Sequence, residues 1–395
     1  MRPGMMKHMA APSPLVRRAC AALALALGCS SGRVSVEEPA VARLCTRVQQ
    51  VPVTPARELP RTVVAASLRH PIGQGRNVVW CASLQLAWNK AVDLVGGPVK
   101  LEGTPALVDG LNERLVGEGD VDPAAALSIA GTIGDGVLDR VVAQLKGCFP
   151  GGAGPKLLSN VDPQTERDVV IYARMLAALP FEAPFEKIYI FWGDRTFDAF
   201  GIEEHKRETR RQGRQVLVHR YESPEDVVVE LVTESRDDRL LLARVRPAAT
   251  LLETCRRVVS RLSDRPDKMR RGDTLRVPAI RIAVRKSWEN LTGRALENRR
   301  WERSWLHRCV QDVVFSLDEQ GAALSADALL QFAWCMRRQR YIMEFNRPFL
   351  VMLLRKGSEL PYLAIWIDND ELLSPASDGP WGRAADEEAP RPREE

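Results

Sequence analysis

The chain has few of the residues on which catalytic sites depend. It contains five histidines, and the four that follow the first 29 residues stand in no recognisable catalytic motif: His70, His205, His219 and His307. It has no Gly-x-Ser-x-Gly nucleophile elbow and no glycine-rich loop of the kind that cradles a phosphate group. These absences argue against an enzyme, and we expect no catalytic residues.

Clustered cysteines are also missing. After residue 29 the cysteines are scattered, with no Cys-x-x-Cys pair and no histidine at metal-ligand spacing: Cys45, Cys81, Cys148, Cys255, Cys309 and Cys335. We therefore expect no metal site and no cofactor. An oxidising compartment would allow one or two disulfides, although the apolar surroundings of most of these cysteines favour buried free thiols.

Neither sign of charge is in large excess, since 56 Lys and Arg oppose 51 Asp and Glu, a net charge of +5. The basic residues cluster in two segments, 206–214 and 268–276. Neither segment has the interleaved aromatic residues that nucleic-acid binding favours, so solvated loops are a better interpretation than a polyanion site. We expect no nucleic-acid partner. A hydrophobic content of 45% excludes global disorder.

The N-terminus has the pattern of an export signal. Lys7, Arg17 and Arg18 form a basic start, and residues 19–27 form an apolar stretch too short to span a bilayer permanently. The sequence around Cys29 resembles a bacterial lipobox, which implies cleavage and lipidation of that cysteine. The alternative is an ordinary secretory signal. In both cases we expect an exported protein, extracellular or held in the cell envelope by a membrane anchor.

Composition divides the rest of the chain into three parts. Residues 30–60 lack sustained periodicity and are typical of a linker. Residues 61–373 contain no long low-complexity break and no repeat, so one monomeric domain is the simplest interpretation. Residues 374–395 are acidic and rich in proline, which predicts a disordered tail.

Apolar periodicity predicts several strands. Val313, Phe315 and Leu317 recur with the period of two that is typical of a half-buried strand, and the apolar run from Val169 indicates a fully buried one. Further strands are expected at residues 77–81, 227–232, 240–245 and 278–284, and a buried hairpin at residues 349–354 and 362–367.

Helices are expected between these strands. Residues 82–91 place apolar side chains on one face, and Thr250 and Glu253 form a capping box that opens another helix. Asp122-Pro123 suits the N-cap and first position of a helix that continues through Leu145. The order of these elements predicts an α+β fold with large mixed or antiparallel sheets surrounded by helices.

Two sets of residues after Leu317 form recognisable motifs. Glu319, Gly321 and Ala326 have the spacing of a hinge, and Phe345, Pro348 and Phe349 form a Phe-x-x-Pro-Phe strand. This arrangement resembles the serpins, in which such a hinge precedes the reactive-centre loop and such a strand follows it. The resemblance implies the serpin fold with an exposed loop. In that family a target protease cleaves the loop, which then inserts into a sheet as an extra strand.

Two other segments are similar to serpin motifs. Asn77 begins a segment similar to the family's Asn-x-x-x-Ser-Pro-x-Ser, and Pro184-Phe185 match the end of its Trp-x-x-Pro-Phe strand. The chain departs from the family at five positions, with Cys81, Ala82 and Leu84 for Ser, Pro and Ser, Ala173 for an Asn, and Phe181 for the Trp. The first three lie where the family's strands part to admit the loop.

An inserted loop would alternate between the two faces of the sheet. The inward set would be Ala322, Leu324, Ala326 and Ala328, and the outward set Ala323, Ser325 and Asp327. An apolar inward set suits burial. Leu324 is bulkier than the small residues that inhibitory serpins have there, so it would slow insertion.

The resemblance also gives candidates for the cleaved bond. Family spacing from Gly321 places it near Cys335-Met336, with Arg337 and Arg338 as alternatives that would suit a trypsin-like protease. The Cys335 thiol would also fit a cysteine-protease target or redox control. The competing interpretation of residues 329–342 is a surface linker.

Three functional hypotheses follow. The leading one is a serpin-like suicide inhibitor of a serine protease, acting through cleavage and insertion of the loop. Its rival is a non-inhibitory serpin-fold lipoprotein that serves as a binding module at the cell surface. A secreted enzyme of unfamiliar type is the third, and the missing catalytic residues argue against it.

Overall fold

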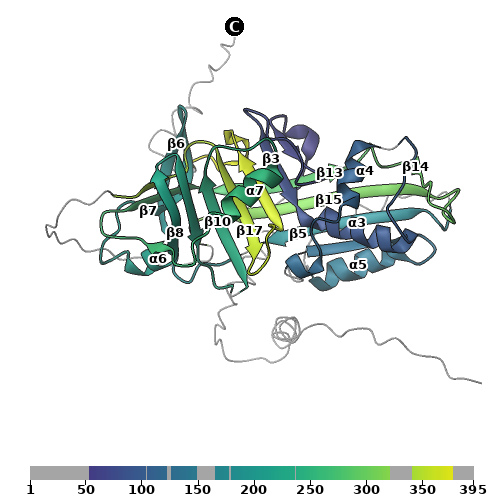
Figure 1. Cartoon of the computed structure of the whole chain (residues 1–395), viewed down its shortest axis with the longest axis horizontal. Coiled ribbons are helices and arrows are strands. Elements are labelled where there is room, and N and C mark those ends of the chain that lie inside the picture. Colours follow the sequence, from purple (N-terminus) through teal and green to yellow (C-terminus); the bar gives the residue numbers. More distant parts are fainter. Residues whose placement is uncertain are drawn as a thin grey trace, which may run out of the picture.

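Three β-sheets and five α-helices make up the described part of the chain (Figure 1). The computed structural model describes residues 53–103, 105–121, 126–148, 165–177, 179–235, 237–320 and 340–376. Large mixed sheets with few helices confirm the expected α+β class. Among the described residues, no helix is long and apolar enough to cross a membrane.

The first sheet has the strand order β1-β13-β15-β5-β4, with β14 also paired to β15. Its strands are β1 (Thr54–Pro55), β4 (Ala126–Thr132), β5 (Val169–Ala177), β13 (Ile280–Ser287), β14 (Arg294–Ala295) and β15 (Trp305–Leu317). β15 and β5 pair in parallel, whereas β13–β15 and β4–β5 are antiparallel. The strand expected at Val313 is therefore the last part of a thirteen-residue strand.

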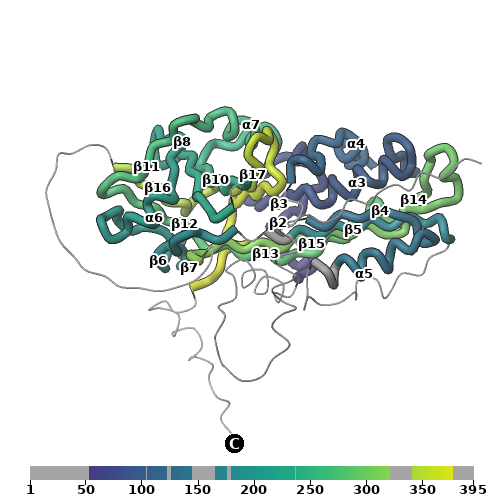
Figure 2. Tube along the Cα trace, turned by 90° about the horizontal axis from the view of Figure 1, so that it is seen from below, coloured from purple at the N-terminus to yellow at the C-terminus, as the bar shows by residue number. Residues whose placement is uncertain are grey.

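Helices cover both faces of this sheet (Figures 1 and 2). α3 (Ala82–Val95) packs on β4 and β5 from one side. α5 (Val137–Cys148) packs on the other, where Val137 and Val141 join Tyr172 and Val314 in a small core. Because both faces are covered, the described side chains of β5 are all buried, and β15 is buried from Cys309 to Phe315.

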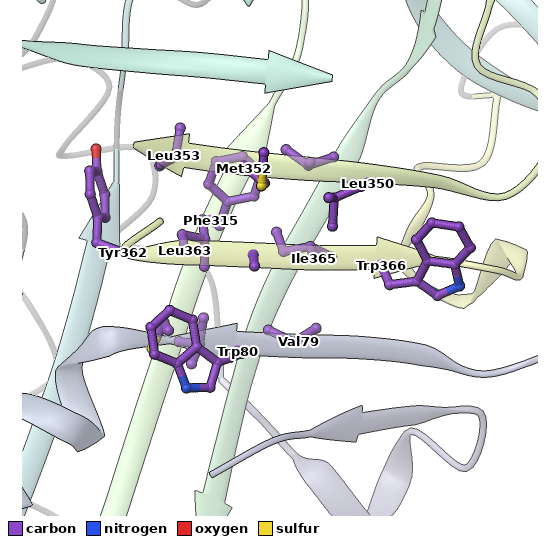
Figure 3. Close-up of a cluster of buried hydrophobic side chains, with 14 of the residues drawn as sticks. Val79, Trp80, Phe315, Leu350, Met352, Leu353, Tyr362, Leu363, Ile365 and Trp366 are labelled. Carbon is purple, nitrogen blue, oxygen red and sulfur yellow. The ribbon is translucent and has the colours of Figure 1, made fainter. Parts of the chain in front are cut away.

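The second sheet has the order β11-β8-β9-β10-β17-β18-β3-β2. Its strands are β2 (Thr62–Val64), β3 (Asn77–Cys81), β8 (Val216–Ser223), β9 (Asp226–Leu231), β10 (Asp238–Arg244), β11 (Asp267–Lys268), β17 (Phe349–Arg355) and β18 (Leu363–Ile367). β17 and β18 form the expected hairpin, with Val351 opposite Ile365. Figure 3 shows Phe315 of β15 among the side chains of this hairpin, so the main core lies between the two large sheets.

The third sheet has the order β16-β12-β7-β6 and lies at one end of the molecule (Figure 2). Its strands are β6 (Glu186–Trp192), β7 (Arg195–Ile202), β12 (Thr274–Pro278) and β16 (Ile342–Glu344). The remaining helical elements are α4 (Ala106–Asn112), α6 (Arg210–Arg214), α7 (Leu251–Val259), η2 (Ala56–Glu58), η3 (Glu118–Asp120) and η4 (Asp370–Leu372).

One capping prediction is confirmed and one is wrong. Thr250 and Glu253 form the reciprocal capping box that opens α7. The helix through Leu145 does not begin at Pro123, because β4 occupies residues 126–132 and α5 starts only at Val137. Leu127 and Ile129 alternate with less buried residues along β4, a strand period that the helical pattern of α5 concealed.

Backbone pairing extends past both expected domain boundaries. β1 pairs with β13 through Thr54 and Val284, ahead of residue 61. Past residue 373, Pro375 forms a bridge with Phe197, and the Ser374 N–H donates to the Ala279 carbonyl at 2.9 Å. Residues 54–60 and 374–376 therefore belong to the folded unit.

Candidate functional site

The parallel pairing of β5 and β15 is the feature of the first sheet that bears most on function. We call the paired residues 169–177 and 306–315 the β5–β15 seam. The chain leaves β15 after Leu317 and re-enters the described fold at Arg340, just before β16. Nineteen residues separate Gln320 from Arg340, an extended length of about 60 Å, enough to span the whole of β15.

The seam's geometry could accept a further strand. A strand placed between β5 and β15 and running against both would pair antiparallel on each of its edges. A segment that turned back from the C-terminal end of β15 would run in that direction. The residues on which the insertion and cleavage predictions rest lie outside the described residues: Gly321, Ala322, Ala323, Leu324, Ala326, Ala328, Cys335, Met336, Arg337 and Arg338.

Glu319 marks the exit from β15 and lies against the start of β6. Its carbonyl accepts a 2.9 Å hydrogen bond from the Phe185 N–H, and its carboxylate lies 3.1 Å from the Lys187 ammonium. The Phe185 ring packs edge-on against Phe181, with 4.8 Å between centroids, and lies 5.7 Å from Phe200. The hinge residue and the Pro-Phe motif therefore meet, and an aromatic cluster fixes their position.

The returning chain is fixed by a second aromatic cluster. Phe345 and Phe349 are both buried and pack at 5.3 Å, with Trp192 of β6 at 6.3 Å from Phe349. Pro348 lies exposed at the bend between β16 and β17. These three motif residues therefore form a turn and an anchor beside the third sheet.

A buried polar cluster lies beneath the seam, on the side of α3. Gln311 of β15 is fully buried and donates from Nε2 to Cys81 Sγ at 3.0 Å and to Ser83 Oγ at 3.2 Å. Ala173 of β5 is in register with Gln311, and Ser128 of β4 is in register with Ala173. Ser128 in turn donates to the Ser83 carbonyl at 3.0 Å.

This cluster lies where the sequence departs from the serpin motif. Cys81 supplies the sulfur and Ala82 begins α3, whereas Leu84 is packed into the core. Burial raises the pKa of the Cys81 thiol to about 11, more than its hydrogen bonds to Ser83 and Gln311 lower it. The sequence patterns do not single out Gln311, although a polar residue in step with Val313 and Phe315 signals a buried amide.

An ion pair lies on the opposite face of the seam. Arg285 of β13 donates to both carboxylate oxygens of Asp312, at 2.7 and 2.9 Å, and the Asp312 side chain is 1% exposed. The hydrogen bonds to Asp312 raise the Arg285 pKa. Arg174 of β5 stands in register with Asp312 across the seam, so this row of charges joins three strands. Burial raises the Tyr172 pKa, and the Asp312 charge adds to the effect.

Asn77 is a structural residue distant in sequence from the seam's strands. Its side-chain Nδ2 donates to Asn369 Oδ1 at 2.8 Å, and its side-chain Oδ1 accepts from the Asp368 and Asn369 backbone N–H groups at 2.8 and 3.0 Å. These bonds tie the start of β3 to the chain that follows β18. Asn77 therefore holds the second sheet together.

Among the described residues, no group of three or more His, Cys, Asp or Glu side chains is placed to hold a metal ion. Cys81, Cys255 and Cys309 are buried free cysteines. Burial raises the thiol pKa of Cys255 and Cys309, so both remain protonated at neutral pH.

Comparison with known proteins gives likenesses at the level of solved structures. No protein-family model matches the chain, and no curated protein matches it. A structure of mouse protein-Z dependent protease inhibitor has a TM-score of 0.48 at 12% identity, covering 83% of this chain and 97% of the mouse protein.

Two further likenesses are weaker. Serpin48 of the insect Tenebrio molitor has a TM-score of 0.37 at 12% identity, covering 59% of this chain. Human thyroxine-binding globulin has a TM-score of 0.39 at 10% identity, covering 60% of this chain. The chain spans 65% of the length of Serpin48 and 64% of that of the globulin.

Proposed function

We propose that this protein is a serpin-type suicide inhibitor of a protease. A protease would cleave the segment between Gln320 and Arg340, and the part attached to β15 would enter the β5–β15 seam as an extra strand. The observation that carries this proposal is the parallel pairing of β5 and β15 directly beside the exit at Glu319. The motif residues around that exit support it.

The protease would carry out the chemical steps of the reaction. Its nucleophile would attack the carbonyl of the cleaved bond, form an acyl-enzyme with the residue before that bond, and release a new amino terminus on the residue after it. Cys335-Met336 is the first candidate bond, with Arg337 and Arg338 as the alternatives for a trypsin-like enzyme. Insertion must displace the protease before water completes the second step.

Insertion would be driven by main-chain hydrogen bonds. Insertion would break the row of hydrogen bonds between β5 and β15 and form two new rows, one on each edge of the entering strand, a net gain of about 1 kcal/mol for each additional bond. The inward residues Ala322, Leu324, Ala326 and Ala328 would face the side on which Ala173 leaves little side-chain bulk. Insertion would also separate Gln311, Asp312 and Arg174 from their present neighbours across the seam. The loss of these contacts opposes insertion.

The second candidate is a serpin-fold binding module without inhibitory activity. Leu324 in the inward set favours it, because a bulky side chain slows entry of the strand. Slow entry would let the protease hydrolyse its acyl-enzyme and leave. In either case we propose an exported protein, with Cys29 as the site of a lipid anchor.

The test is an equimolar incubation of residues 30–395 with trypsin, followed by a denaturing gel. A covalent, SDS-resistant adduct is expected, and mass spectrometry would locate the cleaved bond.

Ala322→Arg should reduce adduct formation at least tenfold, because it would place a charge in the buried row of the inserted strand. Ala323→Arg is the matched control and should retain the adduct. Equal loss in both variants would contradict the insertion mechanism.

A further inference from the structure

The fold joins the two basic segments, 206–214 and 268–276, which are 54 positions apart in the sequence. The His205 N–H donates to the Asp273 carbonyl at 2.8 Å, and the Gly272 N–H donates to the His205 carbonyl at 3.0 Å. These bonds hold the loop before α6 against the loop before β12, and α6 and β12 lie in the same part of the molecule (Figure 2). The sequence alone suggests two separate solvated loops, but in the fold the basic side chains of both segments lie on one surface.

The same surface includes the residue at which the segment 321–339 re-enters the fold. The Tyr341 N–H donates to Asp273 Oδ1 at 3.0 Å, and the Thr274 N–H donates to the Tyr341 carbonyl at 2.9 Å. Arg340 lies across Gly272 so closely that a Cβ on that glycine would be 2.8 Å from the Arg340 Nε. Arg340 therefore extends the basic surface to the end of the proposed reactive loop.

The surface has an excess of basic over acidic side chains, although Glu203, Glu208 and Asp267 are also exposed there. Segments 203–214 and 267–276 together with Arg340 hold ten basic and five acidic side chains, a net charge of +5, as large as that of the whole chain. Asp273 is buried, and Lys206 and Arg270 have acidic partners at 3.3 and 2.9 Å. The exposed basic side chains, which we call the basic surface, are Lys206, Arg207, Arg210, Arg211, Arg214, Lys268, Arg271 and Arg340.

We infer that the basic surface is an auxiliary docking site for a protease whose own surface is acidic around its active site. This inference rests on the proposed function, because it takes the segment next to Arg340 as the part that the protease binds. A protease engaged with that segment covers the surfaces that flank it. A positive flank would raise the association rate of a negatively charged protease by roughly ten- to a thousandfold at low salt and would slow a positively charged one.

Anionic and cationic trypsin provide the test, since both cleave after Arg and Lys and they differ in net charge. The measured quantity is the second-order rate constant for cleavage of the segment, read from the cleaved product and the adduct together. For wild type we expect a rate constant at least tenfold higher with anionic trypsin at low salt. Added NaCl at about 0.5 M should remove the difference, because it shortens the screening length to a few ångströms.

Two charge-matched variants locate the effect. Arg207→Gln, Arg210→Gln and Arg211→Gln combined should lower the rate constant with anionic trypsin about tenfold and leave cationic trypsin unchanged or faster. Arg76→Gln, Arg256→Gln and Arg299→Gln combined remove the same charge from exposed sites elsewhere and should have little effect. Equal effects of the two variants would overturn the inference, since net charge alone would then explain the rates.

Other outcomes are equally decisive. If the first variant loses binding to heparin or duplex DNA while its rate constant with anionic trypsin is unchanged, the surface binds polyanions and the inference is wrong. If cleavage rates follow the predicted pattern but no SDS-resistant adduct forms, the docking site stands and suicide inhibition fails. If adduct forms at rates independent of charge, the proposed function stands and the docking site fails.

Discussion

At the scale of single residues, Gln311 gives a prediction of stability. Among the buried amide side chains of the seam, it is the one whose replacement should destabilise the fold most. It is fully buried and donates to Cys81 and Ser83 at the start of α3. Gln311→Leu would remove its two hydrogen bonds to Cys81 and Ser83 and should lower the free energy of unfolding by about 1–3 kcal/mol, measured by urea denaturation. Gln311→His, which keeps a donor, should cost less; a larger loss from His would contradict this role.

Glu230 gives a prediction of pH dependence. Burial raises its pKa, but hydrogen bonds from His219 and Arg239, at 2.9 and 2.6 Å, together with their charges, outweigh burial and lower the pKa overall. A lowered folded-state pKa stabilises the fold above the unfolded-state value of about 4.3 and loses that contribution as the pH falls through the folded-state value.

Glu230→Gln should therefore destabilise the protein by about 1–3 kcal/mol at pH 7, and the difference from wild type should shrink below about pH 4. Urea denaturation at several pH values measures it. The control is Glu222→Gln, whose carboxylate is mostly exposed beside Arg220 and should matter little at any pH. A difference between wild type and Glu230→Gln that does not vary with pH would contradict the assignment.

At the scale of elements, insertion of a strand into the seam predicts a more stable cleaved protein. About ten new main-chain hydrogen bonds at ~1 kcal/mol each would raise Tm by roughly 10 °C or more. A thermal melt before and after limited trypsin cleavage measures the change. A cleaved product with Ala322→Arg should show a smaller rise, and an unchanged Tm for cleaved wild type would mean that the segment stays outside the sheet.

Local patterns predicted some elements well and others poorly. The β17–β18 hairpin and the α7 cap were predictable because each depends on neighbouring residues. The first half of β15 was not, because polar residues such as Gln311 and Asp312 interrupt its apolar alternation. Their partners, Ser83 and Arg285, are distant in sequence, so only the assembled sheet reveals why polar residues are tolerated there.

From the sequence, only the two ends of the candidate site could be predicted. These are the exit from β15 and the return of the chain before β17. Motif spacing identified Glu319, Phe185 and Phe349, and the structure brings the first two into contact. The seam itself could not be predicted from one sequence, because strand neighbours and their direction depend on pairing between residues 137 or 138 positions apart. The joining of the basic segments was missed for the same reason.

At the scale of the whole molecule, the folded unit should need more of the chain than residues 61–373. A protein of residues 53–376 should unfold cooperatively, whereas one of residues 61–373 loses β1, η2 and the bonds of Ser374 and should be less stable by several kcal/mol. Urea denaturation of the two proteins measures this. Equal stabilities would show that these terminal segments add nothing to the core.

The strand order also constrains how the protein is made. β3, one of the first strands synthesised, pairs with β18 near the C-terminal end, with Val78 opposite Trp366 across 288 residues. Until the last hairpin leaves the ribosome, β3 and β10 each lack a neighbour, and their apolar edges are open to other chains. Newly made chains should therefore depend on chaperones until synthesis is complete, and a nonsense mutation ahead of residue 349 should yield aggregates in place of a partly active domain.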